Sequence, residues 1–138
     1  MSNSKFFLLF RYQLPEALAG LEIDAQEADL FACGIILFVM ASGHFPFESA
    51  KQNDYTYYLL NGDKNANELF WNSHEKITCQ SLADTGRPIF SEDFRDLINR
   101  VLSVDSEERP TLTKIKEHPW MKGPILEDDL IMGYIKGN

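Results

Sequence analysis

Histidines are the side chains best suited to metal binding or acid–base chemistry in this chain of 138 residues, which has three of them. They lie 30 and 44 residues apart, at His44, His74 and His118. No two therefore stand four residues apart, as the paired histidines of a zinc-binding helix do. We interpret all three as ordinary surface or helix-capping histidines, and we predict no metal site.

No pattern in the sequence identifies a catalytic centre. The glycine-rich patterns that cradle nucleotide phosphates are missing, and so is the G-x-S-x-G turn that presents a nucleophilic serine. The two cysteines, Cys33 and Cys79, form no C-x-x-C pair and are too few for the disulfide framework of a small secreted domain. We therefore predict no catalytic or cofactor-binding residue, and a reducing, intracellular environment.

Composition and charge narrow the remaining function classes. A chain of 138 residues with 44% apolar residues can form one domain with one core. Its 13 basic and 21 acidic side chains give a net charge of -8, which disfavours nucleic acid and anionic lipid as partners. The longest apolar run, residues 30–41, is shorter than the roughly 20 residues of a membrane helix. Residues 6–10 are too short an apolar run for an export signal. We expect a soluble, cytoplasmic protein.

The apolar run 30–41 predicts the central helix of the fold. Asp29 precedes the run as a candidate N-cap, and Ser42-Gly43 follows it as a helix end. Because the run has no polar face, we expect the helix to be fully buried by surrounding protein. Gly34 lowers helix stability by about 1 kcal/mol relative to alanine, so we expect another element to pack closely against it.

The other elements are also predicted to be helical, which makes the fold class mainly α. We expect a short helix at 55–60, a helix with weak periodicity at 65–76 and a loop at 79–88. Ser91 caps the clearest amphipathic helix, whose apolar face is Phe94, Leu97, Ile98, Val101 and Leu102. Thr111 caps a short helix at 112–118 that Pro119 ends, and a last helix is expected at 130–135.

Several groups of residues, taken in order, resemble the later part of a eukaryotic serine/threonine protein kinase domain. Leu14-Pro15-Glu16 is similar to the A-P-E that closes the activation segment, with leucine in place of alanine. Residues 29–34 are similar to the D-x-W-S-x-G of the family's central helix, with Phe31 for tryptophan and Ala32 for serine. The remaining matches are Gly43 to Phe47, Asp96 to Leu102, Asp105, Arg109-Pro110-Thr111 and His118-Pro119-Trp120.

The resemblance covers residues 12–121 and divides the chain into three parts. Residues 1–11 form an N-terminal segment of unassigned role, 12–121 a partial kinase-like domain, and 122–138 a C-terminal tail. Phe70-Trp71-x-x-His74 is similar to calcium/calmodulin-dependent-type kinases of single-celled eukaryotes. The implied fold is a helical bundle like the lower part of the kinase large lobe, around one buried helix.

The resemblance also implies roles for particular residues. Glu16 and Arg109 would form the buried ion pair that ties the activation segment to the helical base, for which a guanidinium fork is well shaped. The alternative is two unrelated surface charges. Asp29 would accept backbone N–H groups of the catalytic loop, or it simply caps a helix. Gly34 and Trp120 would serve packing, and the possible peptide-side residues are Tyr12 and Gln13.

The sequence also departs from the family in ways that affect function. The glycine-rich loop, the strand lysine, H-R-D and D-F-G do not occur in it, so ATP and magnesium are implied only for a complete family member. We expect no phosphoryl transfer by this chain alone. Its expected partners are proteins or peptides, including the missing upper-lobe region or another kinase.

Two alternatives stay open at this point. The chain can be a non-catalytic binding module that uses the kinase substrate-docking surface, with the aromatic residues of 55–58, Phe70 and Trp71 partly exposed. It can also fail to fold stably alone, because the catalytic loop that helps to cover the central helix in kinases is missing.

Overall fold

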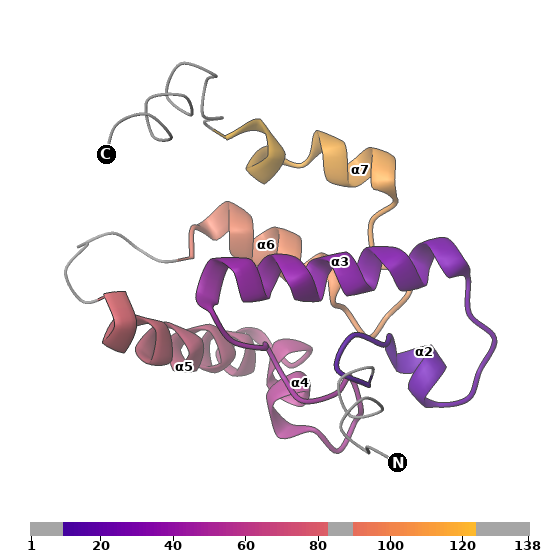
Figure 1. Ribbon diagram of the computed structural model, residues 1–138, viewed down its shortest axis with the longest axis horizontal. Coiled ribbons are helices and arrows are strands. Elements are labelled where there is room, and N and C mark those ends of the chain that lie inside the picture. Colours follow the sequence, from indigo (N-terminus) through magenta and orange to yellow (C-terminus); the bar gives the residue numbers. More distant parts are fainter. Residues whose placement is uncertain (1–9, 83–89, 124–138) are drawn as a thin grey trace, which may run out of the picture.

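The computed structural model describes residues 10–82 and 90–123, and every regular element within these ranges is a helix. The predicted mainly α class is therefore confirmed. The elements are α2 (Pro15–Leu18), α3 (Ala25–Ser42), α4 (Tyr55–Leu60), α5 (Lys64–Leu82), α6 (Glu92–Val101), α7 (Leu112–Glu117) and the 3-10 helix η1 (Pro119–Lys122). In the view of Figure 1, α3 crosses the middle of the molecule, with α6 and α7 on one side of it and α2, α4 and α5 on the other.

Helix α3 begins five residues before the predicted Leu30, so the prediction that Asp29 caps it is wrong. The cap is Asp24, whose Oδ1 accepts hydrogen bonds from the backbone N–H groups of Gln26 at 2.8 Å and Glu27 at 3.1 Å. Residues 25–28 are mostly good helix formers, so the helix extends ahead of the apolar run. It ends at Gly43, whose φ of 84° is left-handed, as predicted for the position after the helix.

The prediction that α3 is fully buried is also wrong for the described part of the chain. One face is buried, and it consists of Phe31, Gly34, Ile35 and Phe38. On the opposite face Ile36 is 46% exposed and Met40 is 79% exposed. By length and composition alone, α3 is long and apolar enough to cross a membrane, a test that core helices of soluble proteins also pass.

Gly34 lies where α3 and α6 pack together. A Cβ atom at this position would lie 2.6 Å from Cγ1 of Val101 and 3.0 Å from Cδ2 of Leu102. Only a residue without a side chain therefore allows the two helices to approach this closely. The close neighbour predicted for Gly34 is the end of α6.

Helix α5 is longer than predicted and supplies much of the core. It runs from Lys64 to Leu82, so the predicted loop is wrong for residues 79–82, and residues 83–89 lie outside the described residues. Its buried edge is Phe70, Trp71, His74 and Thr78. Phe70 is 0% and Trp71 1% exposed, which corrects the expectation that these two rings are partly exposed.

The remaining helices follow the predicted signals closely. Ser91 Oγ accepts from the N–H of Phe94 at 3.1 Å, and the whole predicted apolar face of α6 is buried. The Oγ1 of Thr111 caps α7 in the same way at 3.3 Å. The helix at 55–60 is present as α4, and the one predicted at 130–135 lies outside the described residues.

Candidate functional site

An ion pair joins the N-terminal part of the chain to the link between α6 and α7. Pro15 occupies the first turn of α2, where its missing N–H is harmless, and Glu16 follows it. Nη2 of Arg109 donates to Oε2 of Glu16 at 2.5 Å. The Arg109 side chain is only 5% exposed and that of Glu16 is 22% exposed. The structure thus brings together two predicted residues that are 93 positions apart.

The geometry of this pair differs from the two-nitrogen fork that we expected. Nε and Nη1 of Arg109 are buried and have no hydrogen-bond partner among the described residues. The guanidinium carbon lies 6.0 Å from the centroid of the Phe31 ring. Arg109 therefore depends on Glu16 for its charge compensation in this part of the molecule.

Tyr57 supports the same region from α4. Its hydroxyl donates to the backbone carbonyl of Leu102 at 2.9 Å, which links α4 to the end of α6. Burial raises the pKa of Tyr57, so the hydroxyl stays protonated and keeps this hydrogen bond at ordinary pH. Helix α4 and the end of α6, which lie near the ion pair, are therefore held together by packing and by a hydrogen bond between neutral groups.

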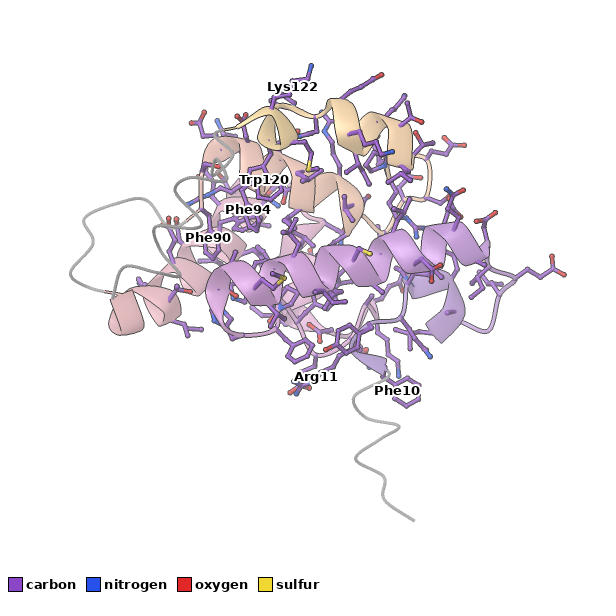
Figure 2. All side chains as sticks on the ribbon, turned by 45° about the horizontal axis from the view of Figure 1, so that its top comes forward. Phe10, Arg11, Phe90, Phe94, Trp120 and Lys122 are labelled. Atoms are coloured by element: carbon purple, nitrogen blue, oxygen red, sulfur yellow. The ribbon has the colours of Figure 1, made fainter. Side chains whose placement is uncertain are left out.

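The predicted peptide-side residues lie near an aromatic surface, defined here as Tyr12, Phe45 and Arg11. The rings of Tyr12 and Phe45 meet edge to face with centroids 5.5 Å apart. The guanidinium carbon of Arg11 lies 4.7 Å from the centroid of Phe45. All three residues are partly exposed, as is Gln13 beside Tyr12. In Figure 2 Arg11 lies at the edge of the molecule opposite Trp120.

Asp29 and Trp120 occupy different surroundings from the ion pair. Asp29 is exposed within α3, where Asp24 and not Asp29 accepts the N–H groups of the first turn. Trp120 is half-buried and packs edge to face on Phe94, with ring centroids 5.7 Å apart. Figure 2 shows Phe90, Phe94 and Trp120 gathered on one side of the molecule.

His118 is a helix-capping histidine, as predicted. Its Nδ1 accepts from the backbone N–H of Trp120 at 3.1 Å at the start of η1, and its Nε2 donates to Oδ2 of Asp96 at 2.7 Å. Burial alone would raise the pKa of Asp96, but the hydrogen bonds from His118 and Arg100 outweigh it and hold this pKa below its ordinary value.

The prediction that all three histidines are surface or helix-capping residues is wrong for His74, which is only 6% exposed, and its contact with His44 was not predicted. Nε2 of His44 and Nδ1 of His74 lie 2.8 Å apart, although 30 residues separate them in sequence. The turn after α3 folds back onto α5, and no local spacing signals this approach. Even so, the described residues contain no group of three His, Cys, Asp or Glu side chains that could hold a metal ion.

The family profile of the protein kinase domain matches residues 2–121. The chain belongs to the protein kinase family. A probable serine/threonine-protein kinase of Dictyostelium discoideum is 32% identical over 109 residues, 79% of this chain and 11% of the relative. A calcium and calcium/calmodulin-dependent serine/threonine-protein kinase of Oryza sativa subsp. japonica is 30% identical over 120 residues, 87% of this chain and 20% of the relative.

This kinase chain is also similar to the SNF-related serine/threonine-protein kinase of Rattus norvegicus, with 31% identity over 112 residues, 81% of this chain and 12% of the relative. The chain thus spans between 11% and 20% of the length of these relatives. The described residues include no candidate metal cluster, and the sequence has no phosphate-binding loop.

Proposed function

We propose that this chain is the helical C-terminal portion of a serine/threonine protein kinase domain. In this role it anchors the end of the activation segment and offers a peptide-docking surface, but it does not transfer phosphate by itself. The observation that carries the proposal is the partly buried ion pair between Glu16 and Arg109, which joins residues 14–16 to the link between α6 and α7. The aromatic surface is formed by two residues that precede that segment in the sequence, Arg11 and Tyr12, and by Phe45 from the turn after α3.

The chemistry available in the chain supports the expectation of inactivity. Phosphoryl transfer requires positioned phosphates, metal ions that neutralise charge, and a residue that orients the nucleophile. The glycine-rich loop, strand lysine, H-R-D and D-F-G that supply these in kinases are not in this sequence. The activity of a complete protein therefore needs residues that this chain does not provide.

The partner that we propose is the kinase-domain part that carries those motifs. Helix α3 presents one exposed face, on which Asp29, Cys33, Ile36 and Met40 follow one another at intervals of three or four residues. An exposed apolar face of this kind is costly in water and is typical of a contact surface. Asp29 stands at its N-terminal end, where the resemblance implies that it accepts N–H groups of the catalytic loop.

Capture of that missing part tests the proposal. The segment from the glycine-rich loop to D-F-G of a similar kinase, such as the SNF-related kinase, would be co-expressed with the tagged chain in a Cys79→Ser background. We expect co-purification, protection of the exposed thiol of Cys33 from alkylation, and loss of both in Met40→Asp. Tyr55→Asp is the matched control, since Tyr55 is also exposed but lies on α4. Equal capture by Met40→Asp and the unaltered chain would contradict the proposal.

A stand-alone binding module is the second candidate function. It is favoured by Tyr55 and Tyr58, which are 67% and 61% exposed. Tyr58 also lines a cavity of about 390 Å³ together with Gln52, Asn61 and Val104. A module of this kind would lose its protein partner in Tyr58→Ser and keep it in Met40→Asp, which is the reverse of the result expected for the first proposal.

We also propose an intracellular, cytoplasmic location and a calcium/calmodulin-dependent-type subgroup. Support for the location comes from the two cysteines, which are too few for a disulfide framework, and from the similarity to kinases. Support for the subgroup comes from Phe70-Trp71-x-x-His74 and from the similarity to the rice kinase, whose name includes calcium/calmodulin dependence. Neither nucleic acid nor membrane is among the partners that we propose.

A further inference from the structure

His44 and His74 form a side-chain pair that lies apart from the ion pair. His44 belongs to the turn that follows α3, and His74 lies in the middle of α5. Their Nε2 and Nδ1 atoms are 2.8 Å apart, and the ring planes are within 15° of each other with centroids 4.9 Å apart. Because the nitrogen–nitrogen distance accounts for most of the centroid separation, the rings meet edge to edge. The pair therefore pins the turn to α5.

The hydrogen bonds around the pair determine where its protons lie. The backbone carbonyl of Pro46 can only accept, so Nε2 of His74, 2.9 Å away, carries a hydrogen. Neutral His74 then has a free lone pair on Nδ1, which accepts from the Nε2–H of His44. His44 can take up a second proton on its Nδ1 and still donate. His74 cannot, because a proton on its Nδ1 would set two N–H groups against each other.

The surroundings of His74 oppose its protonation. His74 is 6% exposed, and its ring lies 5.0 Å from that of Phe38 and 4.5 Å from that of Phe70, measured between centroids. Burial, helped by the positive charge that His44 can carry, lowers the pKa of His74 to about 4. Burial likewise lowers the pKa of His44.

Few charged groups face the pair from the elements packed around it. Arg11, from the N-terminal side, and Glu48, from the segment before α4, line a cavity of about 300 Å³ together with His74. On α5 the next residue is Glu75, whose carboxylate is paired with Arg95 of α6 at 2.9 Å. The contacts from α3 are the uncharged Phe38 and Ser42. Within these groups, no carboxylate is hydrogen-bonded to either imidazole ring.

The turn that the pair holds also carries Phe45, whose ring contacts Tyr12 and Arg11. We propose that the His44–His74 pair is a proton-sensitive contact, or clasp, which opens when His74 is protonated at Nδ1, releases His44 and the start of the turn 43–47 from α5 while the Pro46 carbonyl stays bound, and loosens the aromatic surface. The link to peptide docking rests on the proposed function, whereas the clasp itself does not. Capture of the missing kinase part at pH 7.5, where the clasp is closed, tests the proposed function without testing the clasp. Failure of the proposed function can therefore be told apart from failure of the clasp.

Nuclear magnetic resonance of the 138-residue chain between pH 7.5 and 5 tests the clasp directly. We expect His74 to stay neutral well below the pH at which a free histidine titrates. The protection factors of the His44 and Glu48 amides, which correct for the pH dependence of intrinsic exchange, should fall at least about tenfold per pH unit below about pH 6.5, because opening restores the ordinary proton affinity of His74 and of His44. Protection factors that do not change with pH, or a chain without a folded state at either pH, would overturn the proposal.

His44→Gln provides the variant that keeps a hydrogen bond and removes one proton site. The glutamine amide can donate N–H to neutral His74, or turn its carbonyl oxygen toward a protonated one. The turn should then keep its protection at pH 5, and the pKa of His74 should rise by at least about one unit, a tenfold change in proton affinity. His118→Gln is the matched control and should keep the acid response of the unaltered chain. An acid response in His44→Gln equal to that of the control would also overturn the proposal.

Discussion

Replacing Glu16 with alanine removes the ion-pair partner of Arg109 in the part of the chain that the structure describes. The Arg109 side chain is 5% exposed, and two of its nitrogens already have no hydrogen-bond partner among the described residues. The guanidinium can therefore neither turn to solvent nor move to another protein acceptor without disturbing its neighbours. The variant retains a buried positive charge that is no longer compensated.

The expected loss follows from this burial. An exposed ion pair is worth about 0.2 to 1 kcal/mol, whereas removal of one partner of a buried pair costs about 3 to 5 kcal/mol. Because the Arg109 side chain is 5% exposed but that of Glu16 is 22% exposed, we expect a loss near the lower end of the second range, about 3 kcal/mol. A domain of this kind is stable by about 5 to 15 kcal/mol, so Glu16→Ala should lose a large part of its free energy of unfolding.

Urea unfolding followed by circular dichroism measures this change. With a slope of about 1 to 3 kcal/mol per molar urea, the midpoint should fall by at least about 1 M. The double variant Glu16→Ala with Arg109→Met should recover most of the loss, since apolar replacement of a buried pair is often neutral or stabilising. Arg100→Met is the control, because Arg100 and Asp96 form an exposed pair with side chains 53% and 51% exposed. A Glu16→Ala midpoint equal to that of the control would refute the reasoning.

Three further predictions concern the helices. Gly34→Ala places a Cβ atom 2.6 Å from Val101, so we expect a loss of about 1 to 3 kcal/mol in urea unfolding, and an unchanged midpoint would contradict the close packing. Asp24→Ala removes the N-cap of α3 and should lower the free energy of unfolding by about 1 kcal/mol, while Asp29→Ala should change it by less than about 0.5 kcal/mol. A larger loss in Asp29→Ala than in Asp24→Ala would show that Asp29 is the cap after all. The buried indole N–H of Trp71 donates to Oδ1 of Asn99 at 3.0 Å. Asn99→Ala removes this acceptor and should lower the free energy of unfolding by about 1 to 3 kcal/mol.

Local signals predicted the helices that carry them and failed where two signals competed. Ser91 followed by a regular apolar face defined α6 correctly, because cap and periodicity agree there. At α3, both Asp24 and Asp29 are acceptable caps, and the apolar run favoured the later one. The polar first turn after Asp24 therefore went unrecognised, as did the exposed side of a helix whose sequence has no polar face.

Long-range contacts were predictable only where a family pattern pointed to them. Glu16 and Arg109 were paired through the resemblance, but the single-nitrogen geometry depends on the packing around Arg109. The contact between His44 and His74 had no such pattern, since it arises from the turn after α3 meeting α5. A contact between two side chains that are far apart in the sequence produces no local, periodic pattern from which it could be predicted.

Transfer of radiolabelled phosphate from Mg-ATP to a generic protein substrate tests the central claim most directly. We expect no transfer above background from the purified chain alone. Transfer is expected only when the missing kinase part is supplied, and it should then fall in Glu16→Ala. Transfer by the unaltered chain alone that is abolished in Glu16→Ala would contradict the claim that phosphate transfer requires residues outside this chain.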